Sequence, residues 1–241
     1  MKLLRSAFLL STGLGAAALA TQRKAEAAAA APQSLRTAEP ITTLKPDQYD
    51  RAKMFALLKN AARSKQVFQC ESAKAPHPAR NTDLAHMVNS LNAFELSFGE
   101  PYGRGSLAVL GIFIGEASLL SLNDAMWHNY HLGGLYSLAD EKGRPGMKNV
   151  YYEAHATPAA GETFHKDCSI QTVAKRGGSF MVCHNALNAQ AQHVSTMLGL
   201  EYPRVLGDFV SNLVPEFVLV PAGVAAFQLA QEAGWKPFTV A

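Results

Sequence analysis

Short apolar runs alternate along the chain with longer segments in which apolar residues recur every three or four positions. The stretch 107–114 is apolar at both alternating sets of positions, which is typical of a strand buried on both faces of a parallel sheet. Four further runs predict strands over 65–70, 179–183, 217–220 and 238–240. Strands that alternate with helices predict a three-layer α/β domain with right-handed crossovers, in which ligands bind at the carboxyl ends of the strands.

The three- and four-residue periodicity predicts the helices between these strands. The first begins at Thr82 or Asp83, either of which is a good N-cap, and ends at residue 98 before Gly99. After the run 179–183, Asn185 is the predicted N-cap of a helix whose apolar face begins at Leu187. The remaining helices are predicted over 116–131, 167–175, 205–213 and 222–233. The region 133–164, rich in Gly, Pro and Tyr, reads as an inserted loop, and loops of this length are often functional.

The first 27 residues have the pattern of a cleavable export signal. Lys2 and Arg5 precede an apolar segment over 6–20 that is too short to span a bilayer comfortably, and sites of the A-x-A type occur at 18–20 and 25–27. Residues 28–47 lack a sustained apolar period and read as a flexible tether, so that the folded domain is expected over 48–241. These features predict a periplasmic protein, exported by either the general secretory or the twin-arginine route, and an uncleaved anchor is the alternative.

Cleavage after residue 27 would take the formal net charge from +3 to zero, because four basic residues and one acidic residue lie in the signal. A neutral domain has no basic surface for nucleic acid, and no nucleic-acid partner is expected. After cleavage no membrane partner is expected either, since no longer apolar stretch follows the signal.

Cys183 is the main candidate for chemistry. It ends an apolar run where a strand is predicted to give way to a helix, and the backbone N–H groups of Asn185, Ala186 and Leu187 at the helix start would favour its thiolate. The competing interpretation is an inert buried cysteine. His86, near the start of the first long helix, is a candidate for tuning the ionisation of Cys183.

The chain has three cysteines, an odd number for an oxidising compartment, and no C-x-x-C pair. Cys70 ends the first predicted strand, so in a parallel sheet it lies at the same edge as Cys183. It is therefore a candidate resolving thiol for an oxidised Cys183. A structural pairing of Cys70 with Cys168, or simple packing of Cys70, remains open.

Two segments, Arg176–Leu187 and Val218–Trp235, resemble motifs of the DsrE/DsrF-like (YchN-like) family, and in particular its exported branch. The likeness covers roughly residues 66–240. The resemblance implies a mostly parallel five-stranded sheet and assembly into homo-oligomers. It also implies that one cysteine at the end of a central strand carries sulfur as a persulfide, and by position in the motif that cysteine is Cys183.

Two functions follow from the sequence, and enzymatic activity is left open. The first is a periplasmic sulfur carrier or thiol redox protein that acts through Cys183, with a sulfur donor or acceptor protein or a small thiol as its partner. The second is a non-catalytic oligomeric module that binds a small ligand, haem or metal, or a protein partner, in a pocket under 133–164. His128 and His131 lie one helical turn apart, but Trp127 and Tyr130 beside them suit a core or a subunit interface, and no metal site or cofactor is predicted.

Overall fold

The computed structural model describes residues 43–74, 80–154 and 167–238, and the predicted export signal and most of the predicted tether lie outside them. Within the described residues, five strands form one sheet: β1 (Ser64–Cys70), β2 (Leu107–Phe113), β3 (Ser179–Cys183), β4 (Phe217–Val220) and β5 (Lys236–Phe238). The strand order is β4-β3-β2-β1-β5, and all four pairings are parallel. The predicted α/β fold with a five-stranded parallel sheet is therefore confirmed.

The central strand β2 is buried at all seven positions, as its uninterrupted apolar sequence predicts. Alternate residues of β2 enter two different apolar cores, one on each face of the sheet: Val109 and Phe113 belong to one, and Leu110 and Ile112 to the other. The register pairs Phe113 with the last residue of β1 and with the penultimate residue of β3. The carboxyl ends of the three strands therefore meet at one edge.

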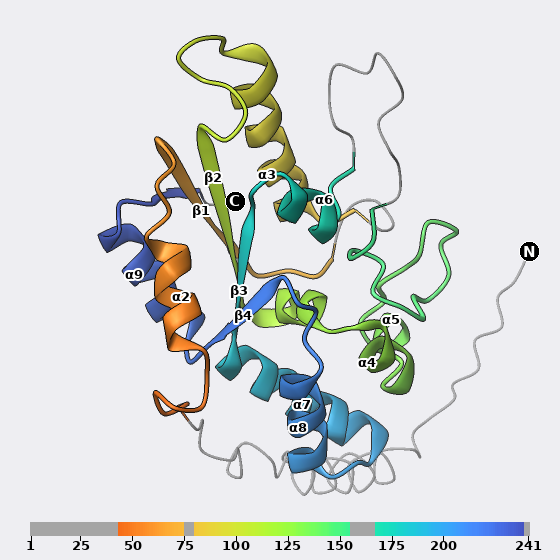
Figure 1. The fold of residues 1–241 in the computed structure, drawn as a ribbon. Helices are drawn as coiled ribbons and strands as arrows, with labels where there is room; N and C mark the ends of the chain where they lie inside the picture. The colour runs from red at the N-terminus through yellow and green to blue at the C-terminus, as the bar shows by residue number, and fades with distance from the viewer. Residues whose placement is uncertain (1–42, 75–79, 155–166, 239–241) are drawn as a thin grey trace, which may run out of the picture. The chain divides into compact units, whose positions relative to one another are not determined.

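Helices cover both faces of the sheet (Figure 1). One core is closed by α2 (Arg51–Leu58) and α9 (Gly223–Glu232), which contribute two buried apolar residues each. The other is closed by the remaining helices, which are α3 (Thr82–Asn92), η1 (Ala93–Ser97, a π-helix), η2 (Gly115–Ser121, a 3-10 helix), α4 (Asp124–Asn129), α5 (Leu132–Leu135), α6 (Ile170–Lys175), α7 (His184–Leu198) and α8 (Tyr202–Ser211). In the part of the chain described here, no helix is both long and apolar enough to cross a membrane.

The prediction of one continuous helix over 116–131 is wrong. Residues 115–121 form the 3-10 helix η2, and Leu122 then adopts an extended conformation and makes a β-bridge to Leu213. The Asn123 side chain accepts a hydrogen bond from the Met126 N–H and so starts α4 as a separate helix. This helix ends at Asn129, and His131, with a φ of 50°, separates it from α5.

The start of the first long helix also differs from its prediction. Asn81 is the N-cap of α3, because its side chain accepts hydrogen bonds from the N–H groups of Asp83 and Leu84. The helix changes to the π-helix η1 at Ala93. The short helix α2 was not predicted, because its eight residues bury only Met54 and Leu58 and show little periodicity.

Gly223 lets α9 begin directly against the carboxyl ends of β2 and β3. A Cβ atom at this position would lie 2.2 Å from Cγ2 of Ile114, the residue after β2, and 3.1 Å from Cβ of Cys183, the last residue of β3. We expect Gly223→Ala to displace α9 and to lower the free energy of unfolding by about 1 to 3 kcal/mol in a urea titration.

Gly207→Ala is the matched control. Gly207 also lies within a helix, α8, but a Cβ there meets no atom within 4 Å. This variant should be neutral or stabilised by up to about 1 kcal/mol, through the better helix propensity of alanine. Equal urea midpoints for the two variants would show that Gly223 is not needed for close packing.

Candidate functional site

Cys183 is the last residue of β3 and the N-cap of α7. Its Sγ accepts a hydrogen bond from the Ala186 N–H at 3.4 Å, and the residue is 6% exposed. The prediction that Asn185 is the N-cap is wrong: Asn185 lies inside the first turn of α7, and the extended residue before the helix is Cys183, with φ −75° and ψ 118°. Ala186 is one of the three residues whose N–H groups were expected to face the sulfur.

Cys183 lies close to the amino ends of two helices. The first is α7, which it caps, and the second is α9, whose first residue Gly223 packs against Cys183 Cβ. Cys183 also pairs in register with Val220, the last residue of β4. The residue before α9, Ala222, offers no side chain to cap it. The partial positive charge of both helix ends therefore favours a negative charge on the sulfur.

The two residues after Cys183 carry buried polar atoms without partners. His184 is 4% exposed, and within the described residues neither its Nδ1 nor Asn185 Oδ1 makes a hydrogen bond. Burial lowers the pKa of His184, so the imidazole is neutral at physiological pH. Unpaired buried polar atoms are rare in proteins, and here two of them adjoin the candidate thiol.

Cys70 lies at the same edge of the sheet but is not brought to Cys183. Strand β2 separates the two, since Cys70 pairs with Phe113 and Phe113 pairs with Val182. Cys70 belongs to the same core as Phe113 and Val182, whereas Cys183 follows Val182 and faces the core closed by α9. Both thiols are free of disulfides. The resolving role of Cys70 stays a prediction.

The predicted tuning residue His86 also lies away from Cys183. Its ring packs on Phe238 of β5, with 5.5 Å between the ring centroids, and β5 is the edge strand beyond β1.

The third cysteine, Cys168, lies just before α6. Burial raises the pKa of its thiol, although the Arg80 guanidinium beside it acts in the opposite direction.

The two histidines considered for haem or metal binding, His128 and His131, are exposed. Trp127 and Tyr130 beside them are buried in the core, as predicted. In the described residues, no three His, Cys, Asp or Glu side chains lie close enough together to hold a metal ion.

Sequence reasoning missed Asp83, a buried carboxyl group beside Cys70. Burial is the main reason that its pKa rises from 3.8 to about 6, and the nearby Glu71 carboxylate adds to the shift. Burial, followed by the Asp83 charge, raises the pKa of the Cys70 thiol well above its usual value. The sequence showed Asp83 only as a helix-start residue, because its contact with Cys70 joins segments that are distant along the chain.

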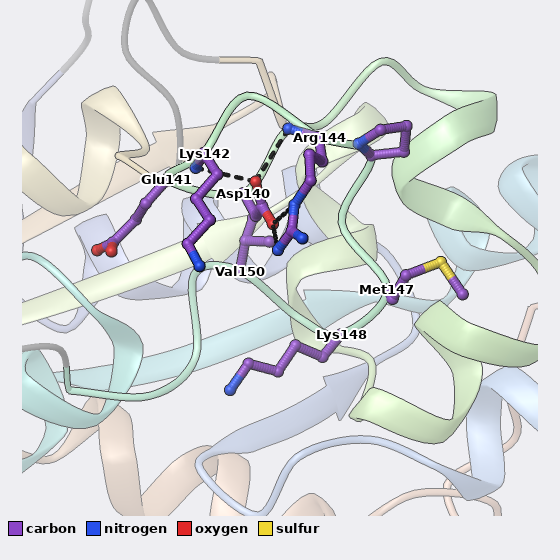
Figure 2. A pocket seen from close by; sticks show the side chains of 8 residues that line it. Asp140, Glu141, Lys142, Arg144, Met147, Lys148 and Val150 are labelled. Carbon is purple, nitrogen blue, oxygen red and sulfur yellow. Dashed lines mark hydrogen bonds and ion pairs between the residues drawn. The ribbon is translucent and has the colours of Figure 1, made fainter.

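The predicted insertion contains a cavity of about 530 Å³ (Figure 2). Its lining residues come from one stretch of chain and are Asp140, Glu141, Lys142, Arg144, Pro145, Met147, Lys148 and Val150. Residues 155–166 of the insertion lie outside the described residues.

One wall of the cavity is a tight turn closed by an ion pair. Arg144 donates two hydrogen bonds to Asp140 Oδ2, at 3.0 and 2.7 Å, and Figure 2 shows its guanidinium folded onto that carboxylate. Asp140 Oδ1 also accepts the backbone N–H groups of Lys142 and Arg144. The hydrogen bonds from Arg144 hold the pKa of Asp140 below its usual value, so the pair stays charged.

The other wall is held by Asn149, which is 1% exposed. Its Nδ2 donates to the carbonyl oxygens of Leu120 and Leu122, both at 2.8 Å, and its own N–H donates to Asp124 Oδ1. These bonds tie the insertion to the end of η2. Lys148 and Val150, on either side of Asn149, therefore have fixed backbone positions in the cavity.

We expect the buried carboxyl group of Asp83 to lower the free energy of unfolding once it ionises. Because its pKa is higher in the folded protein than in the unfolded chain, stability falls as pH rises from about 4 through about 6. We expect Asp83→Asn to raise the free energy of unfolding by about 1 to 2 kcal/mol at pH 7.5, after allowance for solvent screening, and to have no such effect at pH 4.

Urea titrations at both pH values measure this difference. Asp47→Asn, which changes an exposed carboxylate in the same way, is the control and should have no effect at either pH. A variant Asp83→Asn that is less stable than wild type at pH 7.5 would mean that an attractive partner holds Asp83 ionised.

Comparisons with protein-family models and with curated proteins find no relative of this chain. No protein-family model matches it, and no curated protein matches it at a significant level. The resemblance to the DsrE/DsrF-like family therefore stays a prediction from the two sequence segments, and the α/β fold is what the structure establishes.

Proposed function

We propose that the protein carries sulfane sulfur as a persulfide on Cys183. The observation that carries the proposal is the hydrogen bond from the Ala186 N–H to Cys183 Sγ at the start of a 15-residue helix. A backbone N–H is a stronger partner for a thiolate or a persulfide anion than for a neutral thiol, because the hydrogen bond is then charge-assisted. The amino end of α7 adds a favourable field to that bond.

The chemistry needs no change in net oxidation state. The Cys183 thiolate attacks the outer sulfur of a donor R–S–SH, the bond between the two donor sulfurs breaks, and the leaving group is the donor thiolate R–S⁻. Cys183 is then Cys–S–SH, and it ionises to a persulfide anion. The thiolate of an acceptor attacks the outer sulfur in turn and restores the Cys183 thiolate.

The surroundings of Cys183 favour a small donor. The residue is 6% exposed, which leaves little of its surface for contact with a folded partner. Inorganic polysulfide or a low-molecular-weight persulfide is small enough to approach such a site.

The proposed setting is the periplasm, and its support is the signal-like pattern over residues 1–27. A thiol in that compartment meets oxidising conditions, so a burial that admits only small reactants protects it. Homo-oligomer formation belongs to the same proposal, through the family resemblance, and a small thiol is the proposed exchange partner.

Incubation of the reduced protein with inorganic polysulfide tests the proposal. The intact mass should rise by one or more sulfur atoms, and dithiothreitol or cyanide should reverse the rise. In a Cys168→Ser background, which removes the half-buried third thiol, Cys183→Ser should abolish the adduct, whereas the matched control Cys70→Ser should keep it, because Cys70 is fully buried on the other face of the sheet. An adduct that survives Cys183→Ser would contradict the proposal.

A second variant tests the hydrogen bond itself. Ala186→Pro removes the N–H that faces Cys183 Sγ, at a position in the first helical turn where the N–H has no partner within the helix. Loss of a hydrogen bond to a charged group should slow alkylation of Cys183 by iodoacetamide at pH 7 about tenfold. Thermal unfolding provides a check that the variant is folded, and an unchanged rate in a folded variant would show that the cap does not activate the thiol.

A further inference from the structure

We propose that the cavity at residues 140–150 binds a small organic anion that has a carboxylate or sulfonate head and a short apolar body. The cavity lies in the insertion between β2 and β3, and none of its lining residues belongs to the Cys183 site. The proposal therefore does not depend on the persulfide chemistry.

The charges around the cavity favour an anion. Three cationic side chains, Lys142, Arg144 and Lys148, line it together with two acidic ones. Arg144 is committed to Asp140 by two hydrogen bonds, and Lys148 forms an ion pair with Glu153. Among the ion pairs of the described residues, none involves the exposed Lys142 ammonium group. Lys142 is thus the cation best able to pair with a ligand.

Arg144 and Lys148, which already pair with acidic side chains, also contribute to binding of the anion. The Arg144 guanidinium uses Nε and Nη2 for Asp140, and its Nη1 has no hydrogen bond within the described residues. The Glu153 hydrogen bond raises the pKa of Lys148, so its ammonium stays charged. A ligand carboxylate beside Lys142 therefore meets further positive charge, while the acidic partners keep the empty cavity close to neutral.

The rest of the lining suits an apolar body. Pro145, Met147 and Val150 line the cavity with carbon and sulfur; Val150 is 4% exposed, and Met147 is an exposed large apolar residue at 51%. An apolar ligand group that covers Met147 would remove its side chain from water. The volume of about 530 Å³ lies within the range of small-molecule sites.

The cavity is built before any ligand arrives. The ion pair of Asp140 with Arg144 fixes one wall, and the buried Asn149 fixes the other. Between the lining residues Pro145 and Met147, Gly146 packs so close to Gly133 that a Cβ atom on Gly133 would fall 2.2 Å from the Gly146 carbonyl oxygen. A rigid site of this kind loses little conformational entropy when a ligand binds.

Titration of the ¹⁵N-labelled full chain with hexanoate tests the proposal, with amide chemical shifts as the readout. We expect saturable shifts centred on residues 140–150, an affinity that weakens at high salt, and no comparable shifts with 1-hexanol or hexylammonium. Lys142→Glu should weaken hexanoate binding about tenfold, because it reverses the charge of a cation that forms no ion pair with any other described residue.

Lys53→Glu is the matched control, since it makes the same charge change at an exposed position in α2 and should leave hexanoate binding unchanged. Lys148→Glu provides a second lining variant and should also weaken binding. The proposal is overturned if hexanoate gives no saturable shifts, if its shifts centre elsewhere in the protein, if 1-hexanol binds equally well, or if Lys142→Glu behaves like the control.

Discussion

The structure depends on the burial of β2 on both faces. Seven consecutive residues without one exposed position need an apolar layer above and below the sheet. The helices between β1 and β4 form one layer. In the other layer, α9 crosses the sheet from β4 to β5, which lies beside β1. Because all the strands run in one direction, their carboxyl ends share an edge, and α7 and α9 both begin there.

The pleat of the sheet points the two cysteine side chains at that edge toward opposite faces of the sheet. Cys70 and Cys183 lie on strands separated by β2, so two strand spacings, about 10 Å, lie between their backbones. Their side chains enter different cores. A disulfide requires Cα atoms less than about 7 Å apart, so a direct bond between these thiols needs a local rearrangement of the edge. As the structure stands, the partner of Cys183 is the Ala186 N–H and the partner of Cys70 is Asp83.

Short-range patterns allowed the strands to be predicted, and long-range contacts account for what was missed. Four of the five strands agree with their predictions to within one residue at each end, because buried parallel strands are apolar runs bounded by turns. The fifth prediction, over 238–240, shares only Phe238 with β5, and its other two residues lie outside the described part of the chain. The position of Cys183 at a strand end before a helix follows from the same local signal. The environment of Asp83 does not, since its burial depends on β1 packing against α3. The N-cap of α7 was assigned to Asn185 rather than to Cys183, because cysteine is not among the residues that usually cap helices.

The helix predicted over 116–131 is broken at Leu122, and the cavity depends on this break. In a continuous helix the carbonyl oxygens of Leu120 and Leu122 would accept hydrogen bonds from N–H groups four residues later. The break at Leu122 frees both oxygens, and Asn149 binds them with its two Nδ2 hydrogens. The insertion is thus anchored to backbone groups that a regular helix would have used. Periodicity alone did not reveal this anchor, since the same apolar spacing suits both a continuous helix and one broken at Leu122.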